Sequence, residues 1–169
     1  MDDKKRDFLE KSLDRVNNWL QFAETKHAAL IAFLIAILAI LYGGDFIDNI
    51  IMQTIIAVVY LIALIISIIS FFPRYDKDTS HTSGDCINSD NLLFWKDIAK
   101  YSEQEFLKRV YKDFWEEDKE SFGVDEKLYA QEIIANARIA RKKYDLFEKA
   151  VRFAVFGTIL IPIFLIIIA

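Results

Sequence analysis

Four basic residues gather immediately before the last apolar segment of the chain, at Arg138, Arg141, Lys142 and Lys143. Basic residues at such a boundary commonly set membrane topology and meet anionic lipid headgroups. The same cations could instead bind a small anionic ligand, because guanidinium and ammonium groups form strong hydrogen bonds with phosphate oxygens. Arg138 and Lys143 are therefore candidate ligand residues, and both interpretations stay open.

A second group mixes aromatic, cationic and hydrogen-bonding side chains within one or two helical turns. It runs from Asn91 to Asp97 and includes Phe94 and Trp95. Aromatic stacking together with polar contacts to base edges is how proteins hold single nucleotides. A short amphipathic helix that buries its aromatic side chains would give the same pattern. On the first interpretation Asn91, Trp95 and Asp97 are candidates for binding a nucleobase and its ribose.

A third group ends the first amphipathic segment with side chains typical of a membrane surface. Trp19 and Lys26 precede the first apolar segment, and Arg152 stands at the start of the last one. Trp is enriched at the interface between lipid and water, and Lys and Arg flank membrane spans on the cytoplasmic side. We expect these three residues to lie at the membrane interface.

The sequence indicates neither a catalytic centre nor a metal centre. It contains no glycine-rich phosphate loop, no nucleophile elbow and no histidine placed by spacing as a base. Cys86 is the only cysteine, and His27 and His81 are the only histidines, so an intrachain disulfide is impossible and a zinc cluster implausible. We predict no enzymatic activity, no catalytic residue, no metal and no other cofactor. The net charge of -4 disfavours DNA or RNA as a partner.

Apolar residues are segregated into blocks long enough to cross a bilayer. The chain is 54% hydrophobic and 27% charged. The apolar blocks predict three transmembrane helices, at 28–43, 50–72 and 151–169, with an external loop at 44–49. The first span is short for a typical bilayer, and Pro162 is expected to kink the third.

Helical periodicity continues outside the apolar blocks. Apolar side chains alternate by three and four residues in 1–27, and again before residue 151, which is the seam of a helix packed on another helix. Ser102 with Glu105 forms a capping box that opens a helix in between. We predict an all-α fold with long helices that extend into a cytoplasmic helical bundle, made of an amphipathic helix at 1–27 and a helical region at 73–150. The two seams can pack on each other in parallel or on a second copy, so a homo-oligomer is expected.

The distribution of positive charge predicts the orientation. Every Lys and Arg except Arg152 lies before residue 28 or between residues 73 and 150. Because basic residues near span ends are retained in the cytoplasm, the N-terminus is expected inside and the C-terminus outside.

The order of several short motifs around the three spans resembles the transmembrane effectors of Pycsar antiphage systems. The resemblance covers nearly the whole chain and departs from the family at His27 and Ala28. The matching residues are Trp19, Phe22, Ala23, Glu24 and Lys26 before the first span, Phe72, Pro73 and Arg74 after the second, Asn91, Phe94, Asp97, Ile98 and Tyr101 in the middle, and Gln131, Ile139, Ala140, Lys143 and Tyr144 before the third.

The resemblance implies a bacterial inner-membrane effector that is paired with a nucleotide cyclase. In that family, cyclic CMP or cyclic UMP made during phage infection triggers membrane damage and abortive infection. The resemblance does not identify ligand residues here, so the candidates remain those of the physical argument: Arg74, Asn91, Trp95, Asp97, Arg138 and Lys143. Two alternatives stay open, namely a membrane subunit that docks a partner protein and senses no small molecule, and an effector for cyclic oligonucleotides.

Overall fold

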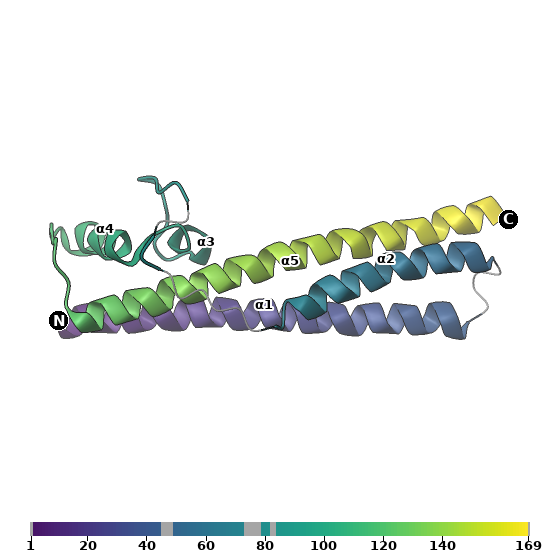
Figure 1. Ribbon diagram of the computed structural model, residues 1–169, viewed down its shortest axis with the longest axis horizontal. Helices are drawn as coiled ribbons and strands as arrows, with labels where there is room; N and C mark the ends of the chain where they lie inside the picture. Colours follow the sequence, from purple (N-terminus) through teal and green to yellow (C-terminus); the bar gives the residue numbers. More distant parts are fainter. Residues whose placement is uncertain (1, 45–48, 73–78, 82–83, 169) are drawn as a thin grey trace. The chain divides into compact units, whose positions relative to one another are not determined.

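The computed structural model describes residues 2–44, 49–72, 79–81 and 84–168, and every regular element within these ranges is an α-helix. The predicted all-α class is confirmed. Side chains are described throughout these ranges except at 165, 167 and 168. The helices in chain order are α1 (Asp3–Gly43), α2 (Ile50–Ile69), α3 (Trp95–Ile98), α4 (Glu103–Trp115) and α5 (Val124–Ile168) (Figure 1).

The two longest helices have no internal stop signal that ends them early. No glycine or proline occurs within α1 before Gly43, which is its last residue, so its amphipathic and apolar parts form one helix. In α5 the amphipathic and apolar parts also form one helix, and Pro162 is accommodated inside it. Neighbouring side chains can satisfy the backbone group that a proline frees in an apolar helix.

The shorter helices begin and end where local hydrogen bonds predict. The capping box of α4 is present, because the Ser102 hydroxyl accepts from the Glu105 N–H and the Glu105 carboxylate accepts from the Ser102 N–H. The helix ends at Glu116, which adopts the left-handed conformation with φ 56°. Asn49 caps α2 by accepting from the N–H groups of Ile51 and Met52.

The chain divides into two compact units. The polar unit comprises Met1–Phe22 and Pro73–Lys142, and the apolar unit comprises Ala23–Phe72 and Lys143–Ala169. α1 and α5 each contribute residues to both units. Each unit is described separately below.

In the polar unit the first parts of α1 and α5 run side by side in the same direction (Figure 1). Tyr129 donates to the Glu10 carboxylate at 2.8 Å, and the Asn136 amide donates to Asn17 at 2.9 Å. Both pairs are 119 residues apart in sequence, as parallel helices require. α4 packs against the same part of α1, where the Phe8 ring lies 4.5 Å from that of Phe114.

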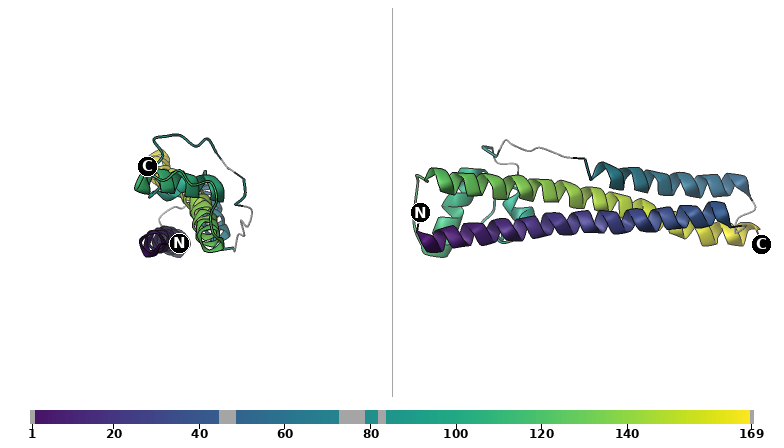
Figure 2. Two further views of the ribbon diagram at one scale, coloured as in Figure 1. Left: turned by 90° about the vertical axis from the view of Figure 1, so that its left-hand side faces the viewer. Right: turned by 90° about the horizontal axis from the view of Figure 1, so that it is seen from below.

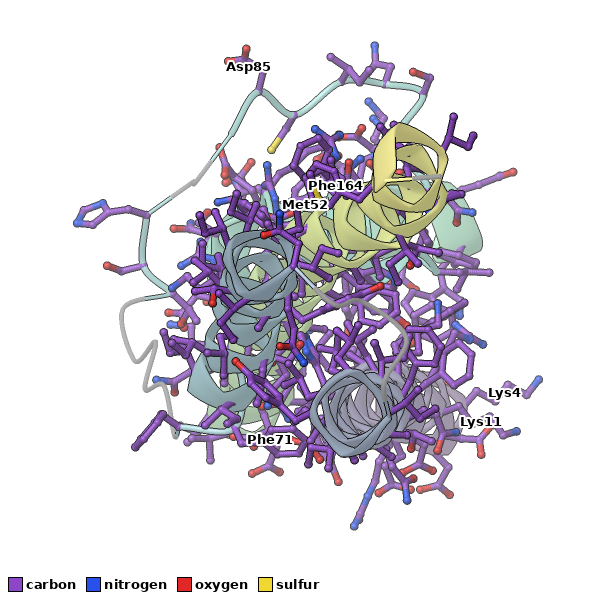
Figure 3. All side chains as sticks on the ribbon, turned by 90° about the vertical axis from the view of Figure 1, so that its right-hand side faces the viewer. Lys4, Lys11, Met52, Phe71, Asp85 and Phe164 are labelled. Atoms are coloured by element: carbon purple, nitrogen blue, oxygen red, sulfur yellow. The ribbon has the colours of Figure 1, made fainter. Side chains whose placement is uncertain are left out.

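In the apolar unit α2 packs against the last parts of both long helices (Figure 2, right). The buried core is formed by Leu34, Leu41, Ile56, Tyr60, Ala63 and Ala154. Met52 on α2 and Phe164 on α5 close the core near the end of the unit that carries the chain terminus (Figure 3). Large apolar side chains such as Ile51, Ile65 and Phe156 face outward.

Within the described residues, α1 and α2 are the helices found to be long and apolar enough to cross a membrane. α1 contains the predicted span 28–43. α2 contains most of the predicted span 50–72 and ends at Ile69. The third span at 151–169 and the orientation of the termini stay predictions. Residues 45–48 of the predicted external loop lie outside the described residues.

Candidate functional site

An open groove on the polar unit combines aromatic faces, a guanidinium and amide side chains. It has a volume of about 520 Å³, within the range of roughly 300–1,000 Å³ typical of small-molecule sites. Its lining residues are Arg15, Asn18, Trp19, Phe22, Asn91, Leu93 and Phe94. We call it the aromatic groove. One wall comes from α1 and the other from the segment that leads into α3.

Three aromatic rings line this groove, Trp19 and Phe22 from α1 and Phe94 from the opposite segment, and together we call them the aromatic wall. The Trp19 indole meets the Phe94 ring edge to face, with centroids 6.3 Å apart and planes at 86°. It also meets Phe22 at 6.5 Å. The spacing of Trp19 and Phe22, three residues apart on α1, places them on one helix face. The rings offer faces and edges against which a planar base can stack.

Arg15 supplies a cation on the α1 wall, one turn before Trp19. Its Nη1 atom is buried and has no hydrogen-bond partner among the described parts of the chain. A buried unsatisfied donor costs about 1–3 kcal/mol, more for a charged group. Such a group is suited to an anionic oxygen, because a guanidinium binds phosphate with strong hydrogen bonds.

The opposite wall is shaped by hydrogen bonds around Asn91. Its side-chain oxygen accepts from the Leu93 N–H at 2.9 Å, which leaves the amide nitrogen to donate. Its own N–H donates to the Asp97 carboxylate at 3.1 Å. Lys100 joins Asp97 to Asp90 through ion pairs of 2.8 and 2.6 Å. The segment that carries Asn91 and Phe94 is thereby held in place from behind.

The protonation states of Asp90 and Tyr101 stabilise the hydrogen bonds behind this wall. Burial acts to raise the pKa of Asp90, but hydrogen bonds from Lys100, Ile87 N–H and Tyr101 hold it below its usual value. Burial, with the neighbouring Asp90 carboxylate, raises the pKa of Tyr101 to about 12. Asp90 is therefore an anion and Tyr101 a neutral donor at neutral pH, as their 3.2 Å hydrogen bond requires.

Other predicted ligand residues have protein partners. Trp95 is buried, with its ring 5.3 Å from that of Phe94, so it supports the aromatic wall from inside. Arg138 is buried in the polar unit and donates to the carbonyl oxygens of Ala99, Tyr101 and His81. The carbonyls of Ala99 and Tyr101 lie between α3 and α4, and that of His81 lies before α3, so Arg138 fastens both segments to α5.

Lys143, the last predicted cation before the third span, lies in the apolar unit. Its ammonium donates to the Ser70 carbonyl at 2.7 Å and pairs with Glu24 at 3.0 Å. Lys26 lies over the Tyr144 ring, 5.2 Å from its centroid. Arg152 pairs with Glu148 and is exposed. Arg74 lies outside the described residues.

Two further grooves of the polar unit suit an anionic nucleotide less well. One, of about 430 Å³, is lined by Arg6, Leu13, Asp125, Leu128, Tyr129 and Glu132, and its arginine already pairs with Glu10. The other, of about 350 Å³, contains three cations, of which Lys108 and Arg109 pair with Glu120 and Asp113. Among the described residues, the aromatic groove is lined by a cation and by no carboxylate.

Comparison with known proteins decides the family. The model of the Pycsar effector protein domain, PycTM, matches residues 8–169 of the chain. The chain belongs to this family. No curated protein and no solved structure matches it. The Pycsar effector is thus a membrane effector of an antiphage system, and the resemblance drawn from the sequence motifs is confirmed.

Some residues of the aromatic groove were candidates from the sequence pattern, and others were not. Asn91 and Phe94 belong to the predicted nucleobase cluster. Trp19, expected at the membrane interface, also lines the groove, and Arg15 was not among the candidates. The signal available for Arg15 is its position one turn before Trp19, on the same face of α1. It becomes informative only when the opposite wall is known.

Proposed function

We propose that this Pycsar effector binds a cyclic pyrimidine mononucleotide, cyclic CMP or cyclic UMP, in the aromatic groove. The ligand then permeabilises the bacterial inner membrane through the apolar unit, which aborts infection. The observation that carries the proposal is the unpartnered Nη1 of Arg15 beside the aromatic wall. A nucleotide needs both features, since its phosphate is anionic and its base is a flat ring.

Each side chain in the proposed site has a chemical task. Trp19 and Phe94 stack against the base, and Arg15 binds the cyclic phosphate. The Asn91 amide nitrogen donates to a carbonyl oxygen of the base or to the ribose. Asp97 and Trp95 hold this wall in position, through the Asn91 N–H and the Phe94 ring respectively.

Arg138 and Lys143 stay predictions as ligand residues, and the proposed site does not depend on them. Both side chains donate to main-chain carbonyl oxygens and are at most 8% exposed. A ligand would have to replace those bonds before it could gain from either cation. The Nη1 atom of Arg15 has no such hydrogen bond for a ligand to replace.

The proposed topology has three spans, with the N-terminus in the cytoplasm and the C-terminus outside. α1 carries Arg15 and Trp19 and continues as the first span, so the binding residues and the membrane share one helix. A ligand changes the population of a state only through its different affinity for the two states. We therefore propose that the groove closes around the nucleotide as the spans of a homo-oligomer rearrange.

The test is loss of the barrier to chloride in vesicles of phosphatidylethanolamine and phosphatidylglycerol that contain the purified protein and an entrapped chloride-sensitive dye. Cyclic CMP or cyclic UMP is expected to admit chloride and quench the dye, and linear UMP is the matched control with the same base. Unchanged dye fluorescence inside the vesicles with every cyclic mononucleotide, with correctly inserted protein, would overturn the proposal. A response to cyclic oligonucleotides alone would transfer the function to that ligand class.

A thermal-shift screen separates the sensor from a membrane subunit that only docks a partner protein. Ligand bound to the native state raises apparent stability with the logarithm of its free concentration relative to Kd, by about 2.7 kcal/mol at a hundredfold excess over Kd. Cyclic UMP is expected to raise the melting temperature and linear UMP to leave it unchanged. A flat response to the cyclic mononucleotides would favour the docking subunit.

A further inference from the structure

Polar side chains of α2 lie almost entirely on one face of this apolar helix. Gln53, Tyr60 and Ser67 are spaced by seven residues, which is close to two full turns, and Ser70 follows at the C-cap. From Gln53 to Ser70 the helix rises about 26 Å, close to the roughly 30 Å thickness of a hydrocarbon core. We call these four residues the polar seam.

The polar seam faces the interior of the apolar unit. Tyr60 and Ser67 are 0% exposed and Ser70 is 2% exposed, whereas Ile51 and Ile65 on the other side of α2 are more than half exposed. This arrangement is the reverse of a water-soluble helix. Polar groups inside a membrane bundle are costly and commonly mark ion pathways.

Part of the seam is satisfied by neighbouring helices. The Gln53 amide donates to the Leu41 carbonyl of α1. The Tyr60 hydroxyl and Thr158 Oγ1 of α5 are 3.0 Å apart, and Thr158 itself donates to the Ala154 carbonyl at 2.9 Å. Tyr60 is therefore the donor of its pair. The seam is bonded to both long helices at these two levels.

The other hydroxyl groups of the seam lack a partner among the residues that the structure describes. Ser67 Oγ and Ser70 Oγ are buried and make no hydrogen bond there, and neither does Nδ1 of the buried His27 in the same unit. Burying an unpaired hydroxyl costs about 1–3 kcal/mol, a cost that alanine would avoid. The packed state thus holds hydroxyl groups that entering water could satisfy.

We propose that the polar seam lines a path for water and small ions across the membrane when nucleotide is bound, an inference that rests on the proposed function. The permeant species are small inorganic ions, because a seam of single hydroxyl and amide groups can replace only part of a hydration shell. On this account the effector kills by conduction through its own helices and leaves the surrounding lipid intact.

Tyr60 closes this path in the present state. Its ring is fully buried in the core and lies against Gly157 of α5, where an added Cβ would stand 3.1–3.3 Å from three ring atoms. A larger residue there would require the ring to shift by a few tenths of an ångström. Opening requires the ring to leave Gly157 and its hydroxyl to leave Thr158, so water can then reach Ser67.

Current across a planar bilayer tests the path directly. Wild-type protein with cyclic UMP is expected to give discrete current steps. Ser67→Ala with Ser70→Ala should lower the step size at least about threefold, since two polar contacts of the permeant ion are lost. Thr54→Val is the matched control, because Thr54 is an exposed hydroxyl on the same helix, bonded to the Ile50 carbonyl at 2.7 Å.

The variants are expected to fold, since the two serine hydroxyls have no partner to lose. Gly157→Ala should produce current without nucleotide, because its methyl group displaces the Tyr60 ring. Absence of current in this variant would show that Tyr60 does not close the path. Equal steps in the double alanine variant and the wild type would overturn the seam.

A size test separates this inference from the proposed function. Vesicles are loaded either with a chloride-sensitive dye or with a fluorescent dextran. Ion entry with dextran retained is expected. Release of dextran by cyclic UMP would overturn conduction through the seam and leave the proposed effector function standing, as bilayer disruption. Absence of both signals would overturn both.

Discussion

The polar and apolar units differ in how fully their buried polar groups are hydrogen-bonded. In the polar unit, Arg138 donates to three carbonyl oxygens and Glu126 accepts from Tyr111, Lys119 and the Gly123 N–H. In the apolar unit, Ser67, Ser70 and His27 keep buried polar atoms without partners. Satisfied networks rigidify a fold, and unsatisfied ones favour another state. The comparison suggests that the polar unit keeps its shape and the apolar unit is built to change.

The exception in the polar unit strengthens this comparison. Arg15 has a buried nitrogen without a partner, and it lies in the aromatic groove. Unsatisfied groups thus occur at the proposed ligand site of one unit and along the proposed ion path of the other. Functional sites are where proteins commonly depart from full satisfaction.

The largest expected effect is the loss of Arg138. Arg138→Met keeps an apolar stem but leaves the carbonyls of Ala99, Tyr101 and His81 without their donor. We expect the free energy of unfolding to fall by more than about 3 kcal/mol, because each buried acceptor left unpaired costs about 1–3 kcal/mol. Urea unfolding in detergent, followed by tryptophan fluorescence, measures it. A loss under about 1 kcal/mol would contradict the view that this unit depends on its buried bonds.

The next effect concerns the aromatic wall. Trp19→Ala should weaken binding of cyclic UMP by about 5- to 150-fold, since stacking of one base contributes about 1–3 kcal/mol. Trp115→Phe is the control, because Trp115 packs on Phe8 away from the groove. Fluorescence titration of both variants measures the affinity. Equal affinities of the two variants for cyclic UMP would show that the ligand does not bind in the aromatic groove.

A pH effect of similar or smaller size is expected at Glu126. Burial acts to raise its pKa, but Tyr111, Lys119 and the Gly123 N–H lower it below 4.5. A lowered pKa means that the stabilisation is complete above the unfolded value and disappears as pH falls through the folded value. Wild type should therefore exceed Glu126→Gln in stability by about 1–2 kcal/mol at neutral pH.

Thermal melts at pH values from about 7 down to about 3 follow this difference. The difference in stability between wild type and Glu126→Gln should narrow steadily as the pH falls below the pKa that the carboxyl group has in the unfolded chain. A gap that stays constant over the whole range would show that the charge of Glu126 does not stabilise the polar unit.

The smallest expected effect is in the apolar unit. Ser67→Ala removes an unpaired hydroxyl, so the packed state should gain up to about 1 kcal/mol or stay unchanged. Ser102→Ala provides the contrast in the polar unit, since it removes the capping box of α4 and should cost about 1 kcal/mol. Thermal stability in detergent compares the two. A destabilising Ser67→Ala would mean that the hydroxyl has a partner in the packed state.

Much of the fold follows from the sequence because its signals are local. The capping box at Ser102, the absence of breakers before Gly43 and the parallel seams of α1 and α5 are all properties of neighbouring residues. α3 is a short helix of four residues, Trp95–Ile98, and backbone hydrogen bonds of the turn type continue after it to Tyr101.

The aromatic groove could be predicted only in part from the sequence, for a physical reason. A groove needs two walls, and Arg15 and Asn91 are 76 residues apart in sequence. Periodicity identifies Trp19 as a helix-face residue but not what lies opposite it. For Arg138, charge and position were visible, whereas its three carbonyl partners belong to segments that only tertiary structure brings together.

The central claim is that a cyclic nucleotide binds through the phosphate contact of Arg15. Calorimetric titration of cyclic UMP into wild type and Arg15→Gln tests it most directly, since Arg15 Nη1 has no protein partner to lose and the variant should unfold like the wild type. The account predicts binding to wild type and an affinity at least about tenfold lower for Arg15→Gln, as expected for a lost charged hydrogen bond. Equal affinities for the two proteins would contradict it.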